Sequence, residues 1–548
     1  MAVVALMVDR VVAVAEDHDG RGREPAVQPL LAARPGARVV DHGDLGAGQL
    51  DGQALGQRAD ERSVVVAEHD VQRGDGAELV EQLGRRDVAG VEDDIGLAQL
   101  VPDIVGEGAA GADVGIGEDG DLEGSGGSHR TSMAWNTRRV DRGERLMPYS
   151  TLGVVHDADA HIMEPPSWLR DHADPEVRDR IETLRYPGGN ELRQTGDPDE
   201  QQRDLDLAFE KMAARHRSEE YRAVEEAEIM SRKNFAATGS FLADDRPRAL
   251  DLLGFSSQLV FNTFHNRRLR DWEHSGDLDL AYGAARAHNR GMVEFCSVDP
   301  RLLASCYVPL VDFDRASAMA GEAIAMGAAA LLVASGCPPG HSPSHIALDP
   351  VWAQAQEAGI PIVFHVGGTG DLIEPGYFDN GLPVPPDFHG GEENFRSVDY
   401  MGIPNPPAQT LATMIFDGVL DRFPRLMVGV IEQGAIWVPS WMRQMESAFD
   451  AFARHEERLQ ALAMRPSEYV SRQVRFTPYP TEDVGWIVAQ AGPEVCLFSS
   501  DYPHVEGGRR PIERFEASLG DASDEVRSRF YRENFLGLMG SAAAPLAA

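Results

Sequence analysis

Several residue types are missing from the first quarter of the chain. No Phe, Tyr, Trp, Cys, Lys or Asn occurs before Trp135, where Gly, Ala, Val, Asp, Glu and Arg dominate. Aromatic side chains contribute much of a core's buried area, so this composition argues against a packed domain. We favour translation of GC-rich DNA upstream of a start at Met133 or Met147 over a native acidic, disordered tail. The predicted division is an extension over residues 1–146 and a folded domain over residues 147–548.

Positive charge is also scarce. The chain has 51 Lys and Arg against 88 Asp and Glu, a formal net charge of −37, which argues against nucleic acid or an anionic membrane as a partner. No apolar run approaches the roughly 20 residues of a membrane span, and Met1–Ala15 lacks the pattern of a signal peptide. We therefore expect a cytoplasmic protein that acts on a small molecule.

Cysteine is rare and unpaired in the sequence. The four cysteines, Cys296, Cys306, Cys337 and Cys496, lie far apart in largely apolar surroundings without a CxxC pair. This spacing predicts buried thiols and argues against a disulfide framework or a thiolate metal site.

From about residue 150, short apolar runs alternate with helical patterns, which is typical of parallel βα units. Eight strands are predicted, at Gly153–Asp159, Ser257–Thr263, Leu302–Leu310, Ala329–Ala334, Pro361–Gly367, Leu426–Glu432, Gln473–Thr477 and in the stretch 495–504. The predicted helices between them are Leu278–Val298, Phe313–Met326, Pro350–Ala358, Ala408–Arg422, Val438–Met464 and Thr481–Gln490. The pattern favours an α/β fold, a (β/α)8 TIM barrel with insertions. A doubly wound sheet would carry a glycine-rich loop after its first strand, and none follows residue 159.

Two insertions follow strands of this pattern. Residues 165–250 are charged and mostly helical, and residues 368–407 are rich in Gly, Pro and aromatic residues. Both leave the carboxyl ends of predicted strands, so we expect both to overhang the barrel mouth and shape a substrate pocket.

Ionisable residues gather at the same end of four predicted strands. Asp159 and His161 end the first strand, His365 lies in the fifth, Glu432 ends the sixth and Asp501 ends the eighth. Strand periodicity places Asp159 and His161 on one face, so both can reach a single ion. Imidazoles and carboxylates suit a divalent cation such as zinc or manganese without thiolate ligands.

Each of these residues also has an ordinary structural interpretation. Asp501 could cap the following turn, His365 could be a core histidine bonded to a backbone carbonyl, and Glu432 could bond to the backbone at Gly434. Asp159 and His161 could simply begin a loop. His345, His389 and His504 lie in predicted loops, where exposure is the default.

Several motifs resemble the amidohydrolase-related family of the amidohydrolase superfamily, the branch of aminocarboxymuconate-semialdehyde decarboxylase. They are D-x-H-x-x-E-P after the first strand, D-P-x-W followed by PIVFHVG, the segment FDGVLDRFPRLMVGVIEQG and the ending SSDYPH. The resemblance covers about residues 150–540 and excludes residues 1–146.

The resemblance implies a cytosolic, metal-dependent TIM-barrel enzyme and a homodimer. It implies one divalent ion, preferably zinc with manganese as the alternative, held by Asp159, His161, His365 and Asp501, with Asp501 and Glu432 as catalytic residues. Two positions depart from the family pattern. Many members have His or Glu where this chain has Asp159, and decarboxylases often have His where this chain has Glu432.

Two classes of function therefore remain from the sequence. The first is a hydrolase or carboxy-lyase (decarboxylase) acting on a small organic acid or ester-like substrate. The second is a non-catalytic barrel that serves as a binding or scaffold subunit. Arg267, Arg268 and Arg270 could bind a substrate carboxylate, although they could equally lie on the solvated surface.

Overall fold

The computed structural model describes residues 147–184, 198–369, 371–383 and 396–546. The predicted extension over residues 1–146 lies outside these residues, and so does His389.

Seven parallel strands form one sheet in the order β1-β2-β3-β4-β5-β6-β7. Their bounds are β1 His156–Ile162, β2 Ser257–Asn262, β3 Leu302–Tyr307, β4 Ala330–Leu332, β5 Ile362–His365, β6 Val428–Ile431 and β7 Val474–Phe476. Strands that follow one another in the sequence are neighbours throughout, without the reversal of order that defines a doubly wound sheet. The predicted parallel α/β architecture is therefore confirmed.

An extended segment, residues 495–502, lies between β7 and β1. On one side, Phe476 donates its N–H to the oxygen of Val495 and Leu497 donates to Phe476; on the other side, Ala158 donates to Phe498. Isolated parallel bridges join Phe476 to Cys496 and Ala160 to Tyr502. This segment, called the closing segment below, connects the two edges of the sheet and gives the arrangement of an α/β barrel.

The closing segment corrects the prediction of a regular eighth strand. The closing segment pairs with β1 and β7 through isolated bridges and single hydrogen bonds, without a continuous ladder. The backbone of Asp501 also adopts a left-handed conformation, with φ of 52°, which a regular strand does not contain.

Helices connect the strands and cover the outside of the sheet. Their bounds are α3 Trp168–Asp171, α4 Pro175–Arg178, α5 Pro198–His216, α6 Glu219–Ala227, α7 Arg246–Leu253, α8 Asn266–His274, α9 Leu278–Cys296, α10 Phe313–Met326, α11 Asp349–Ala358, α12 Ser397–Gly402, α13 Asn405–Phe416, α14 Val419–Arg422, α15 Val438–Phe452, α16 Glu457–Gln460, α17 Pro466–Gln473, α18 Val484–Ala491, α19 Pro511–Leu519, α20 Asp524–Ser528 and α21 Asn534–Met539. None of the described helices has the length and apolar content that a bilayer-spanning helix requires.

Two predicted helices are shorter than expected. The helix predicted over Ala408–Arg422 divides into α13 and α14, because Gly418 has a positive φ of 75°. The helix predicted over Val438–Met464 ends at Phe452, beyond which the chain turns into the short α16. In contrast, α10 has the predicted bounds, with Asp312 accepting a hydrogen bond from the N–H of Arg315 at its start and Gly327 in a left-handed conformation at its end.

The first strand lies three residues later than predicted. All seven residues of β1 are buried, including Asp157, Asp159 and His161. The polar residues that the sequence suggested as a loop start are therefore part of the strand, because the backbone ladder with β2 continues to Ile162. Burial of these side chains requires polar partners, which the site supplies.

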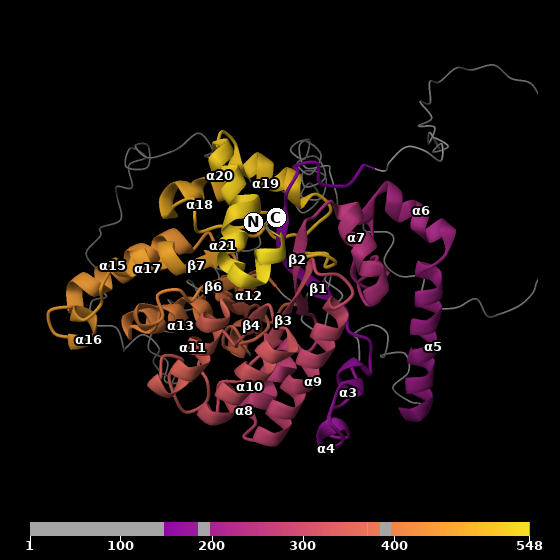
Figure 1. The fold of residues 1–548 in the computed structure, drawn as a ribbon, viewed down its shortest axis with the longest axis horizontal. Helices are drawn as coiled ribbons and strands as arrows, with labels where there is room; N and C mark the ends of the chain where they lie inside the picture. Colours follow the sequence, from indigo (N-terminus) through magenta and orange to yellow (C-terminus); the bar gives the residue numbers. More distant parts are fainter. Residues whose placement is uncertain (1–146, 185–197, 370, 384–395, 547–548) are drawn as a thin grey trace, which may run out of the picture. The chain divides into compact units, whose positions relative to one another are not determined.

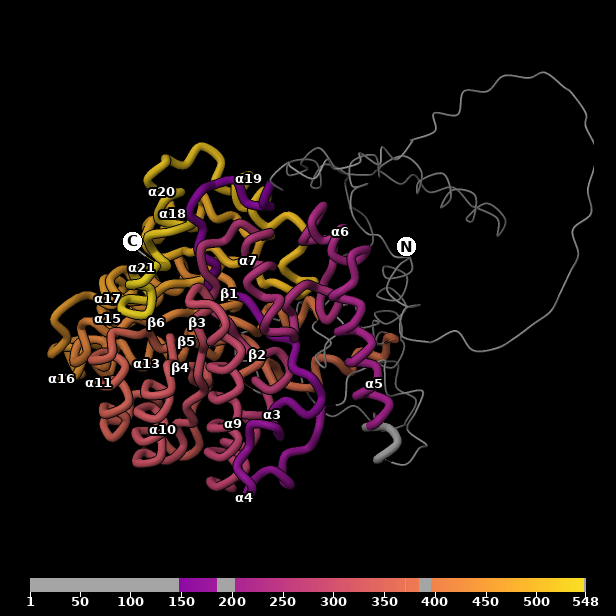
Figure 2. The backbone as a smooth tube through the Cα atoms, turned by 45° about the vertical axis from the view of Figure 1, so that its right-hand side comes forward, coloured from indigo at the N-terminus to yellow at the C-terminus, as the bar shows by residue number. Residues whose placement is uncertain are grey.

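The first insertion packs over the carboxyl end of β1 and the closing segment. Met163 donates its N–H to Ser240, and the Tyr502 hydroxyl donates to the oxygen of Thr238. In Figure 1, α5 and α6 lie at the side of β1 and β2, away from α15 and α16, and Figure 2 shows the same placement from a second direction.

The second insertion contacts the ends of β6 and β7 through α12. The Tyr400 hydroxyl lies 3.4 Å from Glu482, and the rings of Tyr400 and Tyr479 are 5.4 Å apart. Two aromatic residues of this insertion, Tyr377 and Phe378, lie in a short 3-10 helix, Pro375–Phe378, and Tyr377 is exposed. Phe388 and Phe395 lie outside the described residues.

The cysteine prediction requires one correction. Cys296, Cys306 and Cys496 are buried free thiols, but Cys337 is exposed. Cys337 lies in the loop after β4, where the sequence CPPGHSPSH has no apolar residues to cover it.

A crowded glycine in the first insertion provides a test of its packing. Gly239 has φ of +67°, and a Cβ there would lie 2.5 Å from Cα of Arg246. Gly276 is a matched control, because its φ is +81° and a Cβ would meet nothing within 4 Å. We expect Gly276→Ala to cost about 1 kcal/mol of folding free energy and Gly239→Ala about 1 to 3 kcal/mol more. Urea unfolding measures the difference, and equal losses would contradict the packing described here.

Candidate metal centre

Side chains from β1, β5, β6 and the closing segment converge at the carboxyl ends of the strands. The Nε2 atom of His161 lies 3.1 Å from Oδ1 of Asp159 and 3.5 Å from Oδ1 of Asp501. The Nε2 atom of His365 lies 3.3 Å from Oδ1 of Asp159 and 3.2 Å from Oε2 of Glu432. The structure therefore brings together all five residues that the sequence proposed for the site.

Both histidines present an unprotonated Nε2 atom to the carboxylates. Nδ1 of His161 lies 3.0 Å from the carbonyl oxygen of Asn262, and Nδ1 of His365 lies 2.9 Å from that of Val366. Because a carbonyl oxygen only accepts hydrogen bonds, each Nδ1 carries the proton in the neutral ring and each Nε2 carries a lone pair. Such second partners are typical of histidines that bind metals.

Two polar atoms of the site lack a hydrogen-bond partner. Within the described part of the chain, Oδ2 of Asp159 and Nε2 of His161 are buried and make no hydrogen bond, whereas Oδ1 of Asp501 has His504 as an ion-pair partner. Buried polar atoms are normally satisfied, and here lone pairs of nitrogen and oxygen face one another. A cation placed among them would convert this mutual repulsion into coordination, so the residues fit a divalent metal ion.

The separations also fit one ion. Ligand atoms that bind a common ion at about 2.1 Å lie roughly 3 to 3.5 Å apart, close to most of the distances above. Asp159, His161, His365 and Glu432 offer atoms that all lie within 4.8 Å of one another, and His161, Asp501 and His504 form a second such group. His161 belongs to both groups, which makes it the centre of the arrangement.

An unusual backbone conformation orients the side chains of Glu432 and Asp501. Glu432 and Asp501 have φ values of 53° and 52°, in the left-handed region that non-glycine residues rarely adopt. The Glu432 N–H donates to the Thr477 hydroxyl at 2.7 Å, and the Tyr479 hydroxyl donates to the backbone carbonyl oxygen of Glu432 at 2.7 Å. Strained conformations of this kind cluster at functional sites, where the surrounding structure holds them.

His504 is the main residue of the site that the sequence interpretation missed. It was expected to be exposed, but its side chain is only 13% exposed, and its Nδ1 lies 2.8 Å from Oδ1 of Asp501. Its Nε2 lies 2.9 Å from the hydroxyl of Thr263, whose own proton is donated to the oxygen of Ile162 at 2.7 Å. Thr263 therefore accepts from His504, and the spacing D-x-x-H was the available signal.

The electrostatics of the site favour a charged His504. Although burial opposes it, the Asp501 carboxylate raises the pKa of His504 to about 9. Burial and the nearby charge of His504 lower the pKa of His161 to about 4, which keeps His161 neutral.

Glu164, from the first-strand motif, positions the loop after β2. Its carboxylate accepts hydrogen bonds from the N–H groups of Thr263 at 3.0 Å and Phe264 at 3.2 Å, and it lies 3.0 Å from Nδ1 of His265. Glu164 is completely buried. The loop that carries Thr263 is therefore tied to β1, which also carries His161.

A buried polar network supports β1 below the site. Asp157 accepts from the N–H and hydroxyl of Ser500 and from Gln258, which in turn accepts from Nε of Arg246. Nη1 of Arg246 donates to the oxygen of His161 at 2.9 Å. Burial raises the pKa of Asp157 to about 7.

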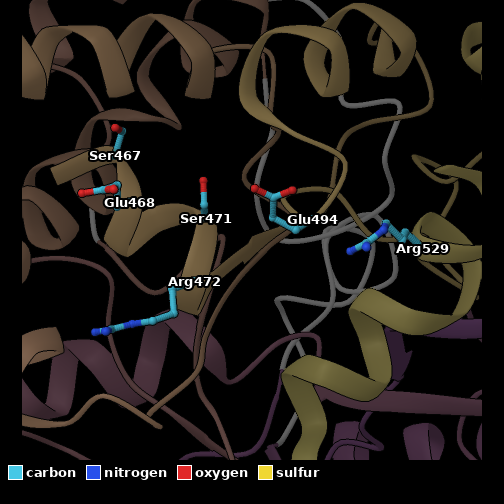
Figure 3. Close-up of a pocket in the computed structure, with 6 residues that line it drawn as sticks. All are labelled: Ser467, Glu468, Ser471, Arg472, Glu494 and Arg529. Carbon is cyan, nitrogen blue, oxygen red and sulfur yellow. The ribbon is translucent and has the colours of Figure 1, made fainter. Parts of the chain in front are cut away.

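A separate hollow of about 440 Å³ lies away from this site. It is lined by Ser467, Glu468, Ser471, Arg472, Glu494 and Arg529. In Figure 3, Glu494 and Arg529 face the α17 residues across the hollow. Because α17 immediately precedes β7 and Glu494 precedes the closing segment, the hollow lies at the amino ends of the strands, opposite the candidate metal centre.

The fold and the site define an α/β-barrel protein with a His, Asp and Glu cluster suited to a divalent cation. The family model described as "Amidohydrolase" matches residues 267–534. That part of the chain belongs to the amidohydrolase family, and the family expected from the sequence is confirmed. A search of curated proteins finds none that matches the chain.

One solved structure supports the fold, and two others are more distantly similar. An amidohydrolase from Mycobacterium avium subsp. paratuberculosis K-10 is 22% identical with a TM-score of 0.53, covering 70% of this chain and 99% of that chain. A 5-carboxyvanillate decarboxylase from Novosphingobium aromaticivorans DSM 12444, solved with bound manganese, is 16% identical with a TM-score of 0.46, covering 70% and 97%. A dihydroxybenzoic acid decarboxylase from Polaromonas sp. JS666, also with manganese, is 13% identical with a TM-score of 0.43, covering 71% and 97%.

Metal content tests the assignment of the site. We expect Asp501→Ala to lose most of the bound divalent ion, because the substitution removes one carboxylate from a shell of few ligands. Asp521→Ala removes an exposed carboxylate and should retain it. Elemental analysis after expression with zinc or manganese measures both variants, and unchanged metal in Asp501→Ala would return this residue to a capping role.

Proposed function

We propose that this protein is a metal-dependent enzyme that acts on a small organic acid or ester-like substrate, by decarboxylation or by hydrolysis. The observation that carries the proposal is the buried Nε2 lone pair of His161, which faces carboxylate oxygens of Asp159 and Asp501. We further propose that His365 completes the ligand set and that the ion is zinc or manganese, since nitrogen and carboxylate oxygen ligands suit both.

A divalent cation in this position supplies Lewis acidity and can lower the pKa of water. The protein itself contributes proton-transfer groups beside that position. Glu432 lies 3.2 Å from Nε2 of His365 and is partly exposed, so its carboxylate can reach a substrate as well as the ligand set. Asp501 and His504 form a close ion pair, in which His504 holds two ring protons.

The two reactions use these groups differently. Decarboxylation requires a proton for the carbon that loses CO₂, and the charged His504 or a protonated Glu432 would supply it. Hydrolysis requires a base for the attacking water, and the Glu432 or Asp501 carboxylate would serve. The presence of Glu432 at the end of β6 supports hydrolysis as the second candidate. A homodimer remains an expectation from the family.

A conservative substitution separates the roles of Glu432. We expect Glu432→Gln to retain the metal but to lower turnover about 10²- to 10⁴-fold, the usual contribution of a general acid or base. Glu457→Gln, at an exposed position of α16, is the matched control. The test measures metal content and the turnover of a panel of small aromatic acids and esters. Loss of metal in Glu432→Gln would contradict the proposed role and would make Glu432 a metal ligand instead.

Isotope labelling separates the two reactions. In ¹⁸O-labelled water, hydrolysis must place the label in the organic product, whereas decarboxylation releases CO₂ and places no label in the remaining organic fragment. We expect one of these outcomes for any compound of the panel that the protein converts. Metal-loaded protein that converts none of them, with no effect of replacing His161, would favour the non-catalytic binding subunit.

A further inference from the structure

Lysine is exceptionally rare in this protein, and one lysine lies beside the closing segment that carries Asp501. Of the 51 Lys and Arg residues in the sequence, two are lysines, Lys211 and Lys233. Lys211 is exposed on α5. Lys233 lies in the first insertion, between the 3-10 helices Ile229–Ser231 and Asn234–Ala236, and its Nζ is buried although its stem is partly exposed.

The backbone fixes Lys233 beside the closing segment. Asn234 donates its N–H to the oxygen of Pro503 at 2.9 Å and adopts a left-handed conformation with φ of 52°. Within the described residues, the other non-glycine residues with positive φ are Glu432 and Asp501. The strained positions of the described chain thus lie at the candidate metal centre or directly next to Lys233.

The Lys233 ammonium has charge neighbours but no hydrogen-bond partner. Among the described residues its Nζ donates no hydrogen bond, and the charges of Asp501 and Glu506 favour the ammonium while that of Arg509 opposes it. Burial lowers the pKa of Lys233, whereas the charges of Asp501 and Glu506 favour its charged form. A buried ammonium with three unused N–H donors is costly unless a ligand pairs with it.

Other cations suggested by the sequence are already paired. Arg267, which is exposed, donates to Asp371 at 2.9 Å, and Arg270, which is partly exposed, donates to Asp271 at 3.1 Å. These two arginines are therefore held in surface ion pairs and are less suited than Lys233 to receive an anionic ligand.

We propose that Lys233 binds an anionic oxygen of the substrate, a carboxylate of a small organic acid, beside the divalent cation. This proposal rests on the proposed function and narrows its substrate class from acids and esters to anionic acids. Lys233 is then a substrate-binding residue that favours a carboxylate over a neutral ester or amide, because the ammonium bonds an anionic oxygen more strongly than a neutral carbonyl oxygen.

Binding of a simple carboxylate tests the proposal. Isothermal titration of the metal-loaded full-length protein with benzoate, and with the neutral analogue benzamide, would be compared among wild type, Lys233→Met and Lys211→Met. We expect Lys233→Met to weaken benzoate binding by about tenfold or more, the effect of losing one charge-assisted hydrogen bond. Benzamide binding and metal content should stay unchanged, and Lys211→Met should behave as wild type.

Three results would overturn the proposal. They are benzoate binding in Lys233→Met equal to wild type, loss of metal together with benzoate in that variant, and absence of benzoate binding by the wild type. If the wild type takes up no metal, the proposed function fails separately. Titration of the metal-free proteins with benzoate then still decides the role of Lys233, since dependence on Lys233 supports it and independence contradicts it.

Thermal stability distinguishes a binding role from a structural one. Replacing an unpaired buried ammonium by the apolar Met side chain removes a desolvation cost, so the melting temperature of Lys233→Met should equal or exceed that of wild type. A lower melting temperature in Lys233→Met, with Lys211→Met unchanged, would show that the ammonium stabilises the fold and would contradict the proposal.

Discussion

Electrostatic repulsion among buried lone pairs is the constraint on which the candidate metal centre depends. Nε2 of His161 faces carboxylate oxygens of Asp159 and Asp501, and its ring proton is already bonded to the oxygen of Asn262. No proton is available between these atoms unless the histidine becomes charged, which burial disfavours. A divalent cation relieves this repulsion. The strained backbones of Glu432 and Asp501, and the partners that hold them, are explained as the means of keeping the ligand atoms in place without the cation.

Hydrogen bonds connect the residues of the site to the surrounding elements of the barrel. Glu164 ties the loop after β2 to β1, and Arg246 bonds to the oxygen of His161. Tyr479 bonds to the oxygen of Glu432, and Tyr400 brings the second insertion to the same edge. These partners are buried or partly buried side chains that come from separate segments of the sequence, so the geometry of the site depends on the completed fold.

Much of this arrangement was predictable from the sequence, for identifiable physical reasons. The alternation of strands and helices predicted the parallel sheet, and the carboxyl ends of parallel strands meet at one edge, which brought Asp159, His161, His365, Glu432 and Asp501 together. Local patterns failed where long-range contacts decide. The bounds of β1 and the irregular closing segment depend on pairing with strands distant in the sequence, and His504 and Lys233 are buried by distant segments that no local pattern reveals.

The most direct measurement of the central claim is anomalous diffraction from crystals of the full chain grown with manganese. We predict a single strong anomalous peak at bonding distance from Nε2 of both His161 and His365 and from carboxylate oxygens of Asp159 and Asp501. A peak elsewhere, or none at these four residues under conditions where manganese is bound in solution, would contradict the account.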